Sequence, residues 1–83
     1  MPFEIIWSDS AVTQLKKLDR SVANQIFQKV TQLKENPYRN VKRIVGSPFF
    51  RLRVGDYRVI TDVQESVLRV LILKMGHGKK IYE

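Results

Sequence analysis

The sequence predicts one α+β domain, in which an N-terminal strand and a helical hairpin precede an antiparallel meander, in the order β-α-α-β-β-β(-β). Three observations predict it. Apolar residues fall at every second position over residues 2–7, recur at helical spacing up to Asn36, and return to period two after Pro37. At 83 residues the chain is long enough for one hydrophobic core, which excludes a second domain.

The opening strand is expected over residues 2–7, where Phe3, Ile5 and Trp7 fall on one face. Side-chain oxygens of residues 8–10 can then cap a helix, because serine and aspartate accept hydrogen bonds from the free N–H groups of a first turn. Apolar residues at helical spacing follow at Ala11, Leu15 and Leu18. A short amphipathic helix therefore follows the strand.

A second helix is expected from a cap at Asp19 to Asn36-Pro37, since proline ends a helix. Its apolar residues form one stripe, Val22, Ile26, Val30 and Leu33. No glycine or proline separates the two helices, so the bend expected near residues 18–21 rests on capping chemistry alone.

After Pro37 we expect strands at residues 42–45, 49–54, 57–63 and 67–73. Gly55-Asp56 makes the tight turn of a hairpin between the second and third of these strands. The run 67–73 is largely apolar and suits a central strand covered on both faces, whereas residues 75–83 are expected to be extended or loop-like. One face of the sheet would pack the helices and leave the other for function.

The composition excludes several classes of protein. No cysteine is present, so a disulfide frame and a thiolate metal site are both excluded. One histidine and eight scattered acids show no ligand spacing, and we expect neither a metal nor another cofactor. The N-terminus has no signal-peptide pattern, and no stretch approaches the ~20 apolar residues that span a bilayer. We therefore expect a cytoplasmic protein.

The net charge of +7 is unevenly distributed. Residues 1–37 hold five Lys/Arg and four Asp/Glu, whereas residues 38–83 hold ten and four. A cationic half predicts a polyanionic partner such as nucleic acid, because neutralising phosphates releases counterions. The alternatives are a solubility charge and a surface complementary to an acidic protein.

Three arginines are candidates for a phosphate site. Alternation puts Arg51 and Arg53 on one face of a strand, and Arg58 lies on the adjacent strand of the hairpin. Neighbouring guanidinium groups repel one another unless an anion lies among them, and their donor forks match phosphate oxygens. The alternative is that each arginine pairs with a surface carboxylate or is merely solvated.

Four residues near the C-terminus combine cations, a phenol and an imidazole: His77, Lys79, Lys80 and Tyr82. Such groups can serve as acid and base in catalysis. The alternative is a solvated tail in which Tyr82 anchors the chain end to the core.

The segments FRLRVGDYRVI (50–60), VLILKMGH (70–77) and KKIY (79–82) resemble toxins of the RelE/ParE superfamily. The resemblance implies a toxin of a type II toxin–antitoxin system, with a RelB-like antitoxin as partner and a sheet like that of microbial RNases. RelE-like members cleave mRNA in the ribosomal A site, which inhibits translation and arrests growth, whereas ParE-like members inhibit DNA gyrase. Three functions stay open: a ribosome-dependent mRNA endonuclease, a gyrase inhibitor, and a non-catalytic RNA-binding module.

The RelE-like mechanism implied by this resemblance needs no metal, because the ribose 2′-hydroxyl attacks the neighbouring phosphorus. Carried onto this chain, the catalytic residues are Arg51, Arg58, His77 and Tyr82. The RNA-binding residues are Arg53, Lys79, Lys80, Lys42 and Arg43. Arginine does not lose its proton in a protein, so Arg51 and Arg53 stabilise charge, and His77 or Tyr82 is the better candidate for the base.

Gly78 departs from the pattern of the superfamily, which usually has an arginine at this place that holds the scissile phosphate. Losing one such contact costs roughly 10²- to 10³-fold in rate, which predicts a weak or inactive enzyme. One hypothesis is a detoxifying change, natural or engineered, and the other is that Lys79 takes the role. If Gly78→Arg brings no gain in toxicity, the first hypothesis is excluded.

Overall fold

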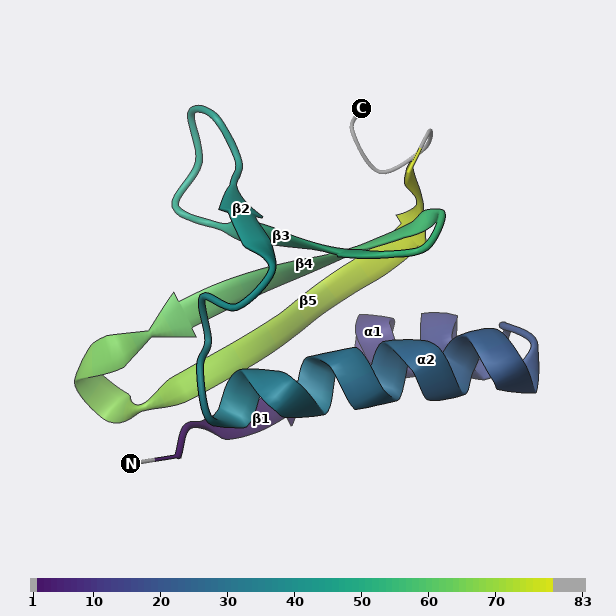
Figure 1. Ribbon diagram of the computed structural model, residues 1–83, viewed down its shortest axis with the longest axis horizontal. Helices are drawn as coiled ribbons and strands as arrows, with labels where there is room; N and C mark the ends of the chain where they lie inside the picture. Colours follow the sequence, from purple (N-terminus) through teal and green to yellow (C-terminus); the bar gives the residue numbers. More distant parts are fainter. Residues whose placement is uncertain (1, 79–83) are drawn as a thin grey trace.

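The computed structural model describes residues 2–78. Within them, one five-stranded sheet is covered on one face by two α-helices (Figure 1). The elements are, in order, β1 (Glu4–Trp7), α1 (Asp9–Lys16), α2 (Arg20–Thr31), the 3₁₀ turn η1 (Gln32–Lys34), β2 (Val41–Arg43), β3 (Phe50–Val54), β4 (Tyr57–Gln64), the 3₁₀ turn η2 (Glu65–Val67) and β5 (Arg69–His77). The predicted α+β class and order of elements are confirmed.

The strands lie in the order β1-β5-β4-β3-β2. From β2 to β5 each strand is antiparallel to its neighbour, which confirms the predicted meander. β1 pairs in parallel with β5, so the last described strand lies inside the sheet between β1 and β4. The expected central strand is therefore found, although on the face away from the helices it is only partly covered.

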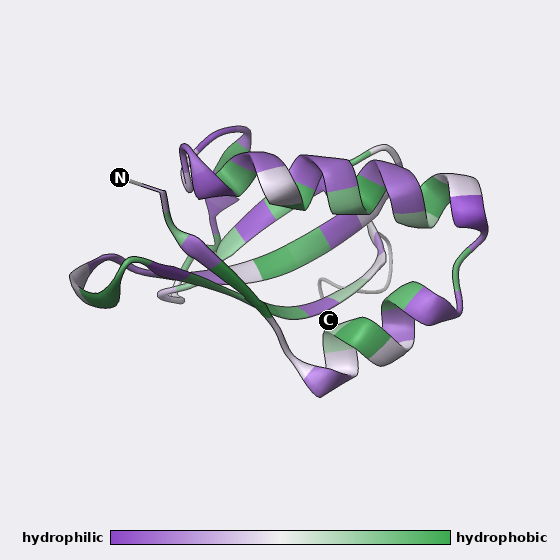
Figure 2. Ribbon diagram, turned by 90° about the horizontal axis from the view of Figure 1, so that it is seen from below, coloured by the Kyte–Doolittle hydropathy of each residue, from purple (hydrophilic) through white to green (hydrophobic). Residues whose placement is uncertain are grey.

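α1 begins where the local chemistry predicts, whereas α2 ends before the expected Asn36-Pro37: the α-helix stops at Thr31, and a 3₁₀ turn continues to Lys34. Ser8 caps α1 with a side-chain oxygen that accepts from the Ala11 N–H at 3.0 Å. Asp19 precedes α2 without a side-chain cap hydrogen bond. Along α2, hydrophilic and hydrophobic residues alternate within each turn (Figure 2), and the apolar side faces the sheet.

The core lies between the helices and the sheet. α2 and η1 contribute Ile26, Val30 and Leu33, each at most 1% exposed. The sheet contributes apolar side chains from three strands: Leu52, Val54, Val59, Val70, Ile72 and Met75. Because every second residue of each strand points into this layer, the intervening residues form a second face without a helical cover.

α1 covers the edge of β5 beyond the point where β1 ends. β1 pairs with β5 as far as Ile72. Past that residue, the Ser8 hydroxyl donates to the Leu73 carbonyl at 2.8 Å, and the Gln14 side-chain oxygen accepts from the Met75 N–H at 2.9 Å. Two side chains thus replace the backbone partners that a longer β1 would supply.

The expected boundaries were wrong for β1, β2 and β5, and β3 and β4 each differ from the expected range by one residue at one end. β5 starts at Arg69 and extends to His77, because β4 pairs with it along its whole length and a register shift beside Ile60/Thr61 accommodates one extra residue. β2 ends at Arg43 because the chain then turns through Gly46, whose φ is +76°, and Val45 is 98% exposed. β1 starts at Glu4 instead of residue 2.

None of the helices in the described residues is long and apolar enough to cross a membrane.

Candidate anion-binding site

The strand register separates the arginines from the core. Leu52, Val59 and Met75 are direct neighbours across three strands, and all are buried beneath the helices. The adjacent rows therefore point to the opposite face, because side chains alternate along a strand. One of these rows is Arg51–Ile60–Lys74, and the other is Arg53–Arg58–Gly76. The parity predicted for the three arginines agrees with this register.

On this face, two pairs of positively charged residues lie opposite each other across neighbouring strands. Arg53 is the register partner of Arg58, and Lys42 on β2 is the register partner of Arg51. Like charges in such cross-strand pairs destabilise a sheet. An anion between them would remove that repulsion, so the arrangement favours a negatively charged ligand.

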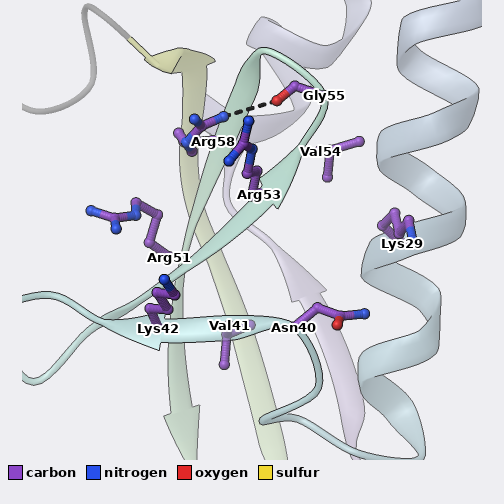
Figure 3. A pocket seen from close by; sticks show the side chains of 9 residues that line it. All are labelled: Lys29, Asn40, Val41, Lys42, Arg51, Arg53, Val54, Gly55 and Arg58. Atoms are coloured by element: carbon purple, nitrogen blue, oxygen red, sulfur yellow. Dashed lines mark hydrogen bonds between the residues drawn. The ribbon is translucent and has the colours of Figure 1, made fainter.

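A cavity of about 610 Å³ lies beside these residues (Figure 3). It is lined by Lys29, Asn40, Val41, Lys42, Arg51, Arg53, Val54, Gly55 and Arg58. Among the described residues that line it, five are cations and none is a carboxylate. Val54 belongs to the core row, and Lys29 comes from α2, so the cavity extends from the arginine face around the edge of β3 toward the helix.

Arg58 is held in place at the β3–β4 turn. Its Nη1 donates to the carbonyl oxygen of Gly55 at 3.0 Å (Figure 3). It also donates to the carbonyl oxygen of Tyr57 at 2.9 Å. Gly78 lies beneath the guanidinium, buried, with its N–H donating to the Asp56 carbonyl at 2.8 Å. The side chain is therefore anchored to backbone instead of being extended into solvent.

The structure does not bring all the predicted residues together. His77 is the register partner of Tyr57 and packs edge-on against its ring, with centroids 5.8 Å apart. This register places His77 on the face opposite Arg58, and it does not line the cavity. Arg43 pairs with Phe50, and its guanidinium lies 5.7 Å from the centre of that ring, outside the cavity lining. Tyr82, Lys79 and Lys80 lie outside the described residues.

Two polar residues of the cavity were missed by sequence reasoning. Lys29 is an exposed residue of α2, and only the packing of that helix brings it to the edge of the sheet. Asn40 has a φ of +60°, which takes the chain out of strand geometry just before β2. Asparagine tolerates this conformation better than most residues and is the one signal that the sequence offered.

The comparisons with known proteins agree on one fold. A sequence model described as the ParE toxin of the type II toxin–antitoxin system parDE matches residues 5–82. A chain of the archaeal RelE–RelB complex from Pyrococcus horikoshii superposes with a TM-score of 0.85 and 23% identity, over 96% of this chain and 99% of that chain. A chain of the RelBE2 toxin–antitoxin complex from Mycobacterium tuberculosis gives a TM-score of 0.83 and 24% identity, over 93% and 99%.

The YoeB/ParE toxin from Agrobacterium tumefaciens gives a TM-score of 0.77 at 14% identity, over 90% of this chain and 98% of that chain. No match was found among curated proteins. The sequence match spans nearly the whole chain, and the solved toxins share its arrangement of strands and helices. The chain therefore belongs to the ParE toxin family of the RelE/ParE superfamily, and it is a toxin of a type II toxin–antitoxin system.

Proposed function

We propose that this toxin is a ribosome-dependent mRNA endonuclease that uses the ribose 2′-hydroxyl of its substrate as nucleophile. The observation that carries the proposal is the gathering of five cations around one cavity, which no carboxylate of residues 2–78 lines. A phosphodiester in this cavity would relieve the repulsion within both cross-strand pairs, Lys42 with Arg51 and Arg53 with Arg58.

In the proposed reaction the protein supplies positive charge, a base and an acid, and the substrate supplies the nucleophile. The 2′-oxygen bonds to the neighbouring phosphorus as a base takes its proton, and the bond from phosphorus to the 5′-oxygen breaks as an acid gives that oxygen a proton. The products are a 2′,3′-cyclic phosphate and a 5′-hydroxyl. Arg51 and Arg58 are assigned to the charge that grows on the phosphorane oxygens, and Arg53 and Lys42 to flanking phosphates.

The position of His77 favours Tyr82 for the proton transfer at the 2′-hydroxyl. His77 packs against Tyr57 on the far side of the sheet from Arg58, and a general base must reach its proton within hydrogen-bond distance. We therefore expect Tyr82→Phe to lower the cleavage rate by roughly 10²- to 10⁴-fold, and His77→Gln to lower it by less than about 10-fold. Single-turnover cleavage of RNA by the two variants measures this difference, and a larger loss in His77→Gln would reverse the assignment.

The proposed partners are a cytoplasmic RelB-like antitoxin, the ribosomal A site and mRNA. RelE–RelB complexes are among the structures most similar to this chain. An antitoxin segment with acidic side chains would suit the cavity cations and would block RNA from them. Lys79 and Lys80, which lie outside the described residues, are proposed to bind RNA as well.

A second candidate function is the inhibition of DNA gyrase, and two observations favour it. The sequence model that matches the chain is that of the ParE toxin. Gly78, which replaces a cation that the nuclease mechanism would use, points in the same direction. A non-catalytic RNA-binding module is the third alternative.

Primer extension on mRNA during translation in vitro, beside a gyrase supercoiling assay, separates these functions. Endonuclease activity predicts cuts that depend on the ribosome and that fall by roughly 10²-fold or more in Arg51→Ala. Arg20→Ala is the matched control, because it removes an exposed arginine at the start of α2, outside the cavity lining. Supercoiling inhibition without cuts would replace the nuclease with the gyrase inhibitor, and RNA binding with neither activity would leave the passive module.

A further inference from the structure

Gly78 lies so close to the Arg58 guanidinium that a side chain at position 78 would contact it. A Cβ atom at position 78 would lie 3.2 Å from Cζ and 3.4 Å from Nη2 of Arg58. Carbon atoms in contact prefer about 3.5–4.0 Å, so any side chain here would press on the guanidinium. The space above residue 78 is thus already filled by the functional group of Arg58.

Residue 78 is poorly placed to retreat from this contact. Its N–H donates to the Asp56 carbonyl at 2.8 Å, which ties it to the β3–β4 turn. The same carbonyl oxygen would lie 3.3 Å from the added Cβ. The guanidinium lies at the end of a flexible side chain, so it is the group that yields. Its movement would strain the two hydrogen bonds from Nη1 to Gly55 and Tyr57.

We infer that Gly78 is a positioning residue, and that its missing side chain lets the Arg58 guanidinium lie anchored at the wall of the cationic cavity. The inference rests on the proposed function insofar as Arg58 binds the RNA phosphate. Glycine at this place therefore leaves the guanidinium where its two hydrogen bonds hold it. It follows that Gly78→Arg displaces Arg58 through its Cβ, whatever charge its own guanidinium adds.

The first test is a double-mutant cycle on affinity for a single-stranded RNA. Gly78→Ala is expected to weaken binding and cleavage by roughly 2- to 5-fold, because the guanidinium must move by a few tenths of an ångström, whereas a displacement of about 1 Å costs up to roughly 100-fold. In an Arg58→Ala background the same change should have no further effect. An equal effect in both backgrounds, or no effect in either, would refute the inference. Gly78→Arg is expected to bind RNA more weakly than the parent chain, and a gain in affinity would also refute it.

The second test reads the position of Arg58 without RNA. The Nε–H resonance of Arg58 can be assigned by its loss in Arg58→Lys, and Gly78→Ala should shift it. Lys74→Ala, which removes a cation from the same face outside the cavity lining, should not. An unmoved resonance in Gly78→Ala overturns the inference. If the resonance moves but the parent chain neither binds nor cleaves RNA, the positioning role holds and the proposed function fails.

Discussion

Tyr38 joins three segments that are distant in sequence. Its hydroxyl donates a hydrogen bond to the Glu65 carboxylate in η2, and its ring packs edge-on against Phe50 in β3, with centroids 5.4 Å apart. The guanidinium of Arg43 in β2 lies over the same Phe50 ring. The short β2 strand is thus held by side chains as well as by its three register pairs.

The hydrogen bond from Tyr38 to Glu65 makes part of the stability depend on alkaline pH. The bond raises the pKa of Tyr38 above its ordinary value of 10.0, and burial and the charge of Glu65 raise it further, while Arg43 opposes them. A raised pKa means that the folded state favours the protonated phenol. The stabilisation is therefore complete below about pH 10 and is lost as the pH rises through the pKa of Tyr38 in the folded protein.

Urea unfolding of the parent chain and of Tyr38→Phe tests this dependence. The parent chain should be the more stable of the two at neutral pH. Its advantage should shrink at strongly alkaline pH, because the phenol loses its proton beside a carboxylate as the pH rises through the raised pKa of Tyr38. Tyr57→Phe serves as the control for a tyrosine outside this cluster. A gap in unfolding free energy that stays constant between the two pH values would contradict the prediction.

At the scale of single residues, the sequence predicted which face of the sheet carries the arginines, but it did not predict which residues from other elements lie beside them. Strand parity alone puts Arg51 and Arg53 on one side, because alternation is a property of the backbone. Lys29 reaches the cavity only through the packing of α2, and no local pattern encodes that. The meaning of Gly78 also changes once its distance to Arg58 is known.

The edge of β5 shows how one element completes another. β1 is too short to cover β5 beyond Ile72, and α1 takes over with the side chains of Ser8 and Gln14. Met75 is 2% exposed, so its N–H has little access to water if the Gln14 oxygen is removed. A buried donor without a partner costs about 1–3 kcal/mol.

Gln14→Ala is therefore expected to lower the unfolding free energy by about 1–3 kcal/mol. Gln28→Ala is the matched control, because Gln28 is an exposed residue of α2, and its replacement by alanine should change stability by less than about 0.5 kcal/mol. Chemical unfolding monitored by the fluorescence of Trp7 measures both. Equal stability of the two variants would mean that water or another group satisfies the Met75 N–H.

At the scale of elements, the type of each segment was more predictable than its ends. The helices follow from capping residues and an apolar stripe, which are local signals. The end of β5 is not local, since Lys74 and Gly76 interrupt its apolar run and only pairing with β4 keeps the segment extended. The parallel partnership of β1 with β5 has no local signal either.

The charge of the whole molecule matters most where it is concentrated. The net charge of the chain is +7, and the cavity is lined by five cations and by no carboxylate of the part of the chain that the structure describes. Binding of single-stranded RNA that neutralises a phosphate with each cation should weaken with salt at a log–log slope of about −0.7 per contact, or about −3.5 in all.

Arg51→Ala should make this slope shallower by about 0.7, whereas Arg20→Ala should leave it unchanged. Titration of a fluorescent single-stranded RNA over a range of potassium chloride concentrations gives both slopes. A change of equal size in the two variants would show that RNA responds to the net charge of the chain and has no defined site.

The position of β5 between β1 and β4 affects how the chain folds during its synthesis. During synthesis the N-terminal strand and both helices leave the ribosome long before the segment that must be inserted beside them. Pairing between ends so distant in sequence is slow to form, because a long loop must close first. The core therefore cannot be completed until residues 69–77 have been made and can enter the sheet between β1 and β4.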